Sequence, residues 1–420
     1  MPKSFDKKLG LTVLVASLGY FVDIYDLQLF NIVSKESLRG IGITDENLIK
    51  TLDYSLFLWQ MSGIIIGGFI WGVLGDKRGR KKILFGSILI YSAANIANAF
   101  VTNVEAYSII RFITGIGLAG ELGAAVTLIN ESMSKEKRGV GTMIIVTMGA
   151  LGAVAAVGIH NIHLSFFGLE SWQTSYIIGG MLGLLLLFMR FQTFESEMFD
   201  KVEKEKVQRG NFFMLFKTKE RTLRYLSCIA IGLPVWFCVG LLIKFSEKFA
   251  SVLEVDGTIN PTTCIIFCYL GLSGGDLISG FISQFLKSRK KIIFFYLGTT
   301  VFISLHFLLV HHHSVTTFYV LAALLGATTG YWVLFVSNAA EQFGTNIRST
   351  VASTVPNFVR GSTVPIVLTF KAMEPSLGVI NSALIIGGIT IAIAAIALAD
   401  RKSTRLNSSH EWISRMPSSA

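Results

Sequence analysis

The chain is 420 residues long, and only 15% of them are Asp, Glu, Lys or Arg, against about 25% in soluble globular proteins. Apolar residue types make up 52%, and Phe alone occurs 32 times. Soluble cores stop growing at roughly 250–300 residues, so a soluble fold cannot bury this much apolar surface. Composition therefore excludes a soluble globular protein and a disordered chain. It predicts an all-α polytopic membrane protein.

Twelve apolar stretches are long enough to cross a bilayer as helices, which takes about 20 residues each. The fifth and eleventh contain many small or polar residues. In chain order the stretches are Leu9–Val33, Tyr54–Gly75, Ile83–Val101, Tyr107–Asn130, Val140–His160, Trp172–Met189, Thr222–Ile243, Thr262–Leu286, Ile292–Val310, Thr316–Ala340, Thr350–Phe370 and Val379–Ala399.

Basic residues gather in alternate loops, which explains the net charge of +10 as a topology signal. The amino terminus and the loops after the second, fourth and eighth stretches are rich in Lys and Arg, whereas 102–106, 161–171 and 311–315 contain none. Cytoplasmic loops carry the excess of Lys and Arg, so both termini are predicted to be cytoplasmic. No nucleic-acid partner is expected.

A long basic linker after the sixth stretch divides the chain into two sets of six. Glu131 and Arg138 follow the fourth stretch, and Glu341 and Arg348 follow the tenth at the same spacing, which indicates a duplication. Two parallel halves are typical of secondary transporters. We predict an N-terminal six-helix half at 1–190, a cytoplasmic linker at 191–221, a C-terminal six-helix half at 222–400 and a non-native tail at 401–420, where the sequence loses all apolar periodicity.

Four segments carry a resemblance to a known family. They are GVLGDKRGRKK at 72–82, RFITGIG from Arg111, FESEMF at 194–199, and the acidic pair in DIYDL from Asp23. Together they resemble the major facilitator superfamily over about residues 1–400. The acidic pair is similar to that of proton symporters for organic and aromatic acids. The glycine–proline motif of drug antiporters and the paired glutamines of sugar porters are missing.

Two buried carboxylates in the first stretch are candidates for proton coupling. An ionised side chain at mid-bilayer costs about 2.5–3.5 kcal/mol on insertion scales, so it needs a cavity or a partner. Asp23 and Asp26 share one helix face, and Arg111 of the fourth stretch lies at a depth similar to that of Asp26. We expect a switch in which Arg111 holds Asp26 ionised and separation lets Asp26 take a proton. The resemblance implies the same pairing, and a static salt bridge is the alternative.

Arg360, near the middle of the eleventh stretch, is the candidate for substrate binding, together with Asn357 and Glu121. A guanidinium fits a carboxylate in two-point fashion. The alternative is a permanent ion pair of Arg360 with Asp276 or Glu121. Glu121 could also relay protons, or serve a structural role by balancing a nearby cation. Lys244, at the end of the seventh stretch, is expected to extend to the outer surface.

A further set of residues lies at the cytoplasmic ends of the stretches, where charges can lock the two halves in one conformation and release them in the other. The glycine in the loop after the second stretch suits a tight turn. We assign gating to Gly72, Asp76, Gly79, Arg80, Glu131, Arg138, Glu341 and Arg348.

The histidines lie mostly at the outer ends of stretches, so no metal site is predicted, and no cofactor or enzymatic activity is expected. The leading interpretation is a monomeric transporter of the cell membrane that moves a small organic solute, a carboxylate metabolite, by proton symport and alternating access. Its cavity is expected between stretches one, four, seven, ten and eleven. The alternatives are a sugar or neutral-solute uniporter, an efflux antiporter of the same superfamily, and a nutrient receptor that does not transport.

Overall fold

The computed structural model describes residues 3–133, 138–163, 165, 168–190, 211–286, 288–344 and 346–399. Most of the predicted linker, including the acidic segment at 194–199, and the predicted tail at 401–420 lie outside the described residues. So do the side chains of Arg80, Glu131 and Arg138.

The N-terminal half is built of seven described helices, three of which begin at a side-chain cap. Asp45 caps the second helix by accepting from the Asn47 backbone N–H. Gly79 has a φ of 92°, which favours glycine, and supplies the expected turn between the second and third helices. The helices are α1 (Lys3–Gly40), α2 (Glu46–Arg78), α3 (Arg80–Asn98), α4 (Val104–Leu118), α5 (Glu121–Ser132), α6 (Arg138–Asn161) and α7 (Ser171–Met189).

The C-terminal half is also built mainly of α-helices. It includes a π-helical turn, η3, which directly follows α9, the helix that contains Pro234. The described elements are η2 (Phe212–Phe216), α9 (Lys219–Phe237), η3 (Cys238–Ile243), α10 (Ser246–Val252), α11 (Pro261–Leu286), α12 (Arg289–Leu309), α13 (Val315–Thr328), α14 (Trp332–Glu341), α15 (Arg348–Gly361) and α16 (Thr363–Ala399).

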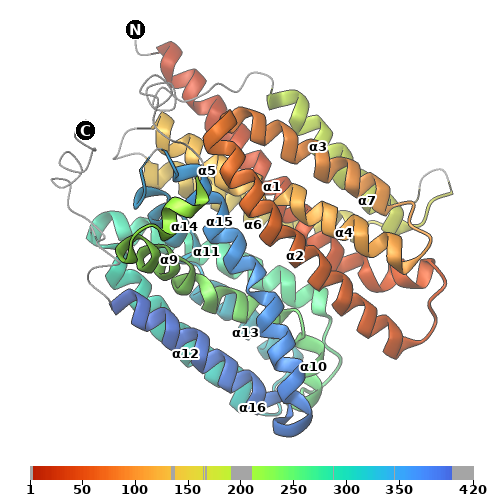
Figure 1. The fold of residues 1–420 in the computed structure, drawn as a ribbon. Coiled ribbons are helices and arrows are strands. Elements are labelled where there is room, and N and C mark those ends of the chain that lie inside the picture. Colours follow the sequence, from red (N-terminus) through yellow and green to blue (C-terminus); the bar gives the residue numbers. More distant parts are fainter. Residues whose placement is uncertain are drawn as a thin grey trace.

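Ten described segments are long and apolar enough to cross a membrane. Helix α3 is not among them, and the last segment, Arg348–Ala399, is 52 residues long. Gly378, at a φ of 76°, breaks that segment, and the chain reverses direction there (Figure 1). The fourth and tenth predicted stretches are each broken near the middle, between α4 and α5 and between α13 and α14. The two breaks occupy corresponding positions in the two halves.

The two halves form two helical bundles side by side, coloured red to yellow and green to blue in Figure 1. Large apolar side chains such as Phe285 and Phe302 are exposed on the outside. Arg111, Arg190, Arg348 and Arg360 are among the largest fully buried side chains. Apolar surface therefore faces outward and charge faces inward, as lipid requires.

Helix α15 lies against α2 and α5 along positions that only glycine can occupy. A Cβ on Gly68 of α2 would stand 2.7 Å from Asn357 Cβ, and one on Gly123 of α5 would stand 2.5 Å from Ser353 Cα. Both distances are too short for real atoms. The absence of side chains at these glycines lets the C-terminal half close tightly on the N-terminal half at the end that carries Asp76.

Candidate functional site

Arg360, in the last turn of α15, pairs with a carboxylate of the other half. Its Nη2 lies 3.1 Å from Asp23 Oδ2 and 3.2 Å from the Tyr20 hydroxyl, both on α1. Arg360 and Asp23 are fully buried. The expected alternative partners, Asp276 and Glu121, are therefore wrong, and Asp23 takes their place. Sequence reasoning had placed Asp23 beside Asp26 rather than opposite Arg360.

Asp26 and Arg111 lie buried in the N-terminal half without forming a hydrogen-bonded pair. Neither oxygen of Asp26 and no nitrogen of the Arg111 guanidinium has a hydrogen-bond partner among the described residues. Arg111 and Asp23 are the charged groups that act on Asp26 electrostatically. The Arg111 guanidinium instead lies 4.5 Å from the centre of the Phe30 ring and 5.8 Å from that of Tyr176. The two groups are thus neighbours that are available to pair in another conformation.

Glu121 belongs to a buried ion pair at the start of α5. Its Oε2 lies 2.7 Å from Arg190 Nη2, its Oε1 lies 3.1 Å from Arg190 Nη1, and the Ser87 hydroxyl donates to Oε1 at 2.7 Å. This geometry is a two-point Arg–carboxylate contact within one half. It balances Glu121 with a cation from the end of α7, the last residue of the predicted N-terminal half. A substrate role for Glu121 stays a prediction.

Asp276 of α11 holds the start of α14, because its Oδ1 accepts the Val333 backbone N–H at 2.9 Å. A helix N-terminus has orphan N–H groups, and a carboxylate satisfies them well. Its other oxygen, Oδ2, has no hydrogen-bond partner among the described residues.

Asp76, from the second helix of the N-terminal half, caps the first turn of α15 in the C-terminal half. Its carboxylate accepts the backbone N–H groups of Ser349 at 3.0 Å and Thr350 at 2.8 Å, and the Thr350 hydroxyl at 2.6 Å. Thr350 also donates to the carbonyl of Gly72 at 3.3 Å. Asn357 adds a contact at the same interface by donating to the Ala119 carbonyl at 2.7 Å. These bonds close this end of the bundle.

The predicted gating residues do not all form one group. Glu341 makes a two-point contact with Arg289, at 2.6 and 3.0 Å, inside the C-terminal half. Arg348 is buried at the start of α15. The side chains of Arg80, Glu131 and Arg138 lie outside the described residues, so their predicted gating contacts do too.

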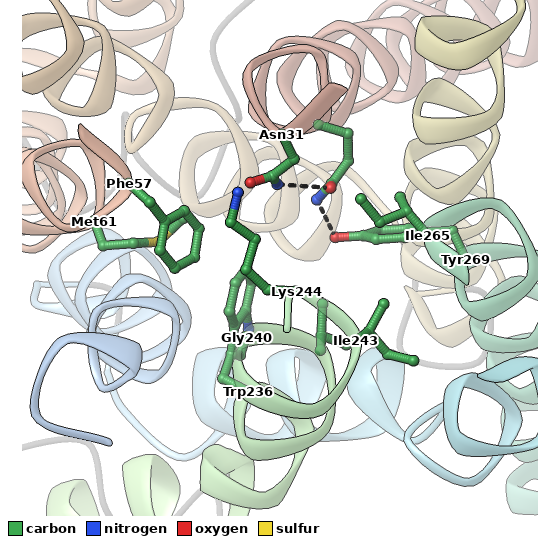
Figure 2. A pocket seen from close by; sticks show the side chains of 11 residues that line it. Asn31, Phe57, Met61, Trp236, Gly240, Ile243, Lys244, Ile265 and Tyr269 are labelled. Carbon is green, nitrogen blue, oxygen red and sulfur yellow. Dashed lines mark hydrogen bonds between the residues drawn. The ribbon is translucent and has the colours of Figure 1, made fainter. Parts of the chain in front are cut away.

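A small pocket lies between the halves (Figure 2). Its lining includes Gln28 and Asn31 of α1, Phe57 of α2, Tyr269 of α11, and Lys244, which directly follows η3. Predicted stretches one, two, seven and eight therefore border it. The expected cavity between stretches one, four, seven, ten and eleven stays a prediction. Its volume of about 10 Å³ has room for about one water molecule. Asn31 donates to Gln28, and Gln28 donates to the Tyr269 hydroxyl, as the dashed lines in Figure 2 show.

Ion pairs also join the halves at the end opposite Asp76. Lys244 lies 3.2 Å from Asp53 of α2, and Lys35 of α1 lies 2.7 Å from Glu247 of α10. The Lys371 ammonium lies 3.3 Å from the centre of the Tyr54 ring. Lys244 is thus half-buried against the other half instead of extending to the surface as expected. These contacts join the two halves at this end as well.

Comparison with known proteins identifies the family. The family model of the Major Facilitator Superfamily matches residues 16–363. The chain belongs to the major facilitator superfamily. The "Putative niacin/nicotinamide transporter NiaP" of Bacillus subtilis (strain 168) is 26% identical, over 96% of this chain and 97% of that protein. The "Sialic acid transporter NanX" of Escherichia coli (strain K12) is 25% identical, over 87% of each.

A solved structure shares the fold. The proton:xylose symporter XylE superposes with a TM-score of 0.67 at 17% identity, covering 93% of this chain and 95% of that one. This superfamily member is accordingly a multi-pass protein of the cell membrane that transports small metabolites, and it is not an enzyme.

Proposed function

We propose that this protein imports a small carboxylate metabolite together with protons by alternating access. We also propose that it is a monomer with twelve membrane helices and two cytoplasmic termini. Counting α3, and counting the arms before and after Gly378 separately, brings the ten candidate segments to twelve. The basic loops support the orientation.

The buried carboxylate of Asp26, which has no hydrogen-bond partner among the described residues, is the observation that supports proton coupling. An ionised carboxylate that accepts no hydrogen bond is costly in a buried site, and this cost supports a protonated Asp26 in this conformation. If α4 shifts against α1 within the N-terminal half and brings Arg111 to Asp26, the ion pair stabilises the charged form and the proton leaves. A proton is thereby taken up in one conformation and released in another, which is what symport requires.

Buried positive charge supports a carboxylate substrate. The Arg111 guanidinium has no hydrogen-bond acceptor among the described residues, and Lys244 lines the pocket between the halves. Niacin, which the name of one relative gives beside the neutral amide nicotinamide, and sialic acid, in the name of another, are carboxylic acids.

The test is uptake of labelled organic acids into proteoliposomes, with an inward proton gradient imposed or collapsed. We expect accumulation that depends on the gradient in the native protein. Asp26→Asn should lose accumulation and keep exchange of labelled for unlabelled substrate, because exchange needs no net proton movement. Asp45→Asn is the matched control, since it makes the same chemical change at an exposed cap that Asn also serves.

Two results would overturn the proposal. Gradient-independent equilibration of a neutral solute by both the native protein and Asp26→Asn would indicate a uniporter. Accumulation driven by an outward proton gradient would indicate an antiporter.

A further inference from the structure

Lys244 is a cation held by contacts that all come from the opposite half. Its Nζ hydrogen-bonds Asp53 Oδ1 at 3.2 Å and lies 5.6 Å from the centre of the Phe30 ring and 5.3 Å from that of Phe57. These residues are on α1 and α2, whereas Lys244 follows η3 of the C-terminal half. Asp53 is its one hydrogen-bond acceptor among the described residues.

These contacts last only while this end of the bundle is closed. Asp53 lies near the start of α2 and Asp76 near its end, so they mark opposite ends of the interface. When the halves separate at the end of the interface where Asp53 lies, Lys244 loses its contacts with the Asp53 carboxylate and with the rings of Phe30 and Phe57 at the same time. Its ammonium then faces the open pocket, where an anion from outside can reach it.

The pocket around Lys244 has the composition of a binding site. Phe57, Met61 and Trp236 supply flat or flexible apolar surface, while Gln28 and Asn31 add amide groups that donate hydrogen bonds within the lining. Figure 2 shows the Lys244 side chain extending between Phe57 and the amides of α1. The π-helical turn η3 lies directly before Lys244, and such turns are frequent at functional sites.

Arg360 is less suited to hold the substrate anion in this conformation. It is already paired with Asp23 and the Tyr20 hydroxyl, and it is not among the residues that line the pocket. Lys244 is the one cationic side chain in that lining.

We propose that Lys244 binds the carboxylate of the substrate and that the substrate displaces Asp53 from it. The ligand class is a small monocarboxylate with a flat apolar body that packs on Phe57, Met61 and Trp236. This inference rests on the proposed function, because it assigns the anion-binding residue of the same transporter. Asp53 competes with the substrate for Lys244. When the halves close in the empty protein, Lys244 pairs with Asp53, and when they close around substrate, Lys244 pairs with the substrate carboxylate.

The test compares an anion with its neutral amide on purified full-length protein. The probes are nicotinate with nicotinamide, and benzoate with benzamide, measured as dissociation constants with labelled ligand. We expect Lys244→Gln to weaken carboxylate binding about 10- to 100-fold, the size of a lost charge-assisted hydrogen bond. Amide binding should change little, and Lys244→Arg should retain most carboxylate affinity.

Two further variants distinguish a role of Lys244 in substrate binding from a role only in holding the two halves together. Asp53→Asn should tighten carboxylate binding, because the competitor is gone. The double variant Asp53→Asn with Lys244→Gln should stay weak for carboxylates. Lys248→Gln is the matched control: Lys248 pairs with Glu374 within the C-terminal half and does not line the pocket.

Three results would overturn the proposed role of Lys244, and a fourth would separate that role from proton symport. Normal carboxylate affinity in the double variant, equal losses for carboxylate and amide in Lys244→Gln, or no carboxylate binding by the native protein would each overturn the role of Lys244. Failure of proton-driven uptake, with the expected binding pattern intact, would remove the symport proposal and leave Lys244 as the anion site.

Discussion

Arg360 of α15 donates a hydrogen bond to Asp23 of α1 at 3.1 Å, across the boundary between the two halves. Both side chains are fully buried. The guanidinium that the sequence suggested as a substrate clamp is thus occupied by a carboxylate of the protein itself. Any contact of Arg360 with substrate requires this pair to separate first.

Removing one partner of this pair should destabilise the fold strongly. We expect Asp23→Asn or Arg360→Gln to cost about 3–5 kcal/mol, because each leaves one buried charge without its counter-ion. The double variant should recover most of that loss, since no unpaired charge remains. Thermal unfolding of the detergent-solubilised protein measures the effect. Glu46→Gln, which breaks the exposed pair with Arg39, is the control. Losses that simply add in the double variant would contradict the pairing.

The carboxylate of Asp76 should hold one end of the interface shut. Asp76→Ala removes the acceptor for Ser349 and Thr350, so this end should open more often. With Ser353→Cys as a buried reporter on α15, we expect maleimide labelling to become about tenfold faster, in proportion to one lost charge-assisted bond. Glu105→Ala, an exposed change at the other end, should leave labelling unchanged. An unchanged rate in Asp76→Ala would show that Asp76 does not control closure.

Much of the fold could be predicted because lipid imposes simple rules on the chain. The length of the apolar stretches predicted where helices lie. The turn at Gly79 was predicted because glycine tolerates a positive φ. The buried positions of Asp23, Asp26, Arg111 and Arg360 followed from the cost of charge in lipid. These inferences depend only on local sequence.

Pairing could not be predicted, because it depends on how the two halves meet. The sequence does not single out Asp23 as the partner of Arg360, or Glu121 as the partner of Arg190, which lies at the edge of a basic linker. Lys244 was predicted to extend to the surface because it ends a stretch. In the structure it forms an ion pair with Asp53 of the opposite half and lies at the interface. Opposite charges at matched depth were the one signal that pointed to such pairs.

Glu121 should prove structural when its charge is removed. Glu121→Gln leaves Arg190 buried without an anion, and we expect a loss of about 3–5 kcal/mol in unfolding free energy. Adding Arg190→Gln should restore most of it, and the restored protein should transport its substrate with nearly native KM. The comparison is thermal unfolding beside uptake kinetics. A restored fold with a KM raised about tenfold or more would instead support the predicted substrate role.

The close approach of α15 to α5 gives a steric test of alternating access. In Gly123→Ala the new methyl group would stand 2.5 Å from Ser353 Cα and 2.6 Å from its backbone nitrogen, so neither neighbour can move without shifting α15 itself. Overpacking of this kind costs about 1–3 kcal/mol, and the cost falls only on the conformation that is closed at this end. We therefore expect faster maleimide labelling of Ser353→Cys, slower uptake, and little change in expression. Gly274→Ala is the matched control, because a Cβ there meets nothing within 4 Å. Equal labelling rates in the two alanine variants would mean that the closed state does not depend on this contact.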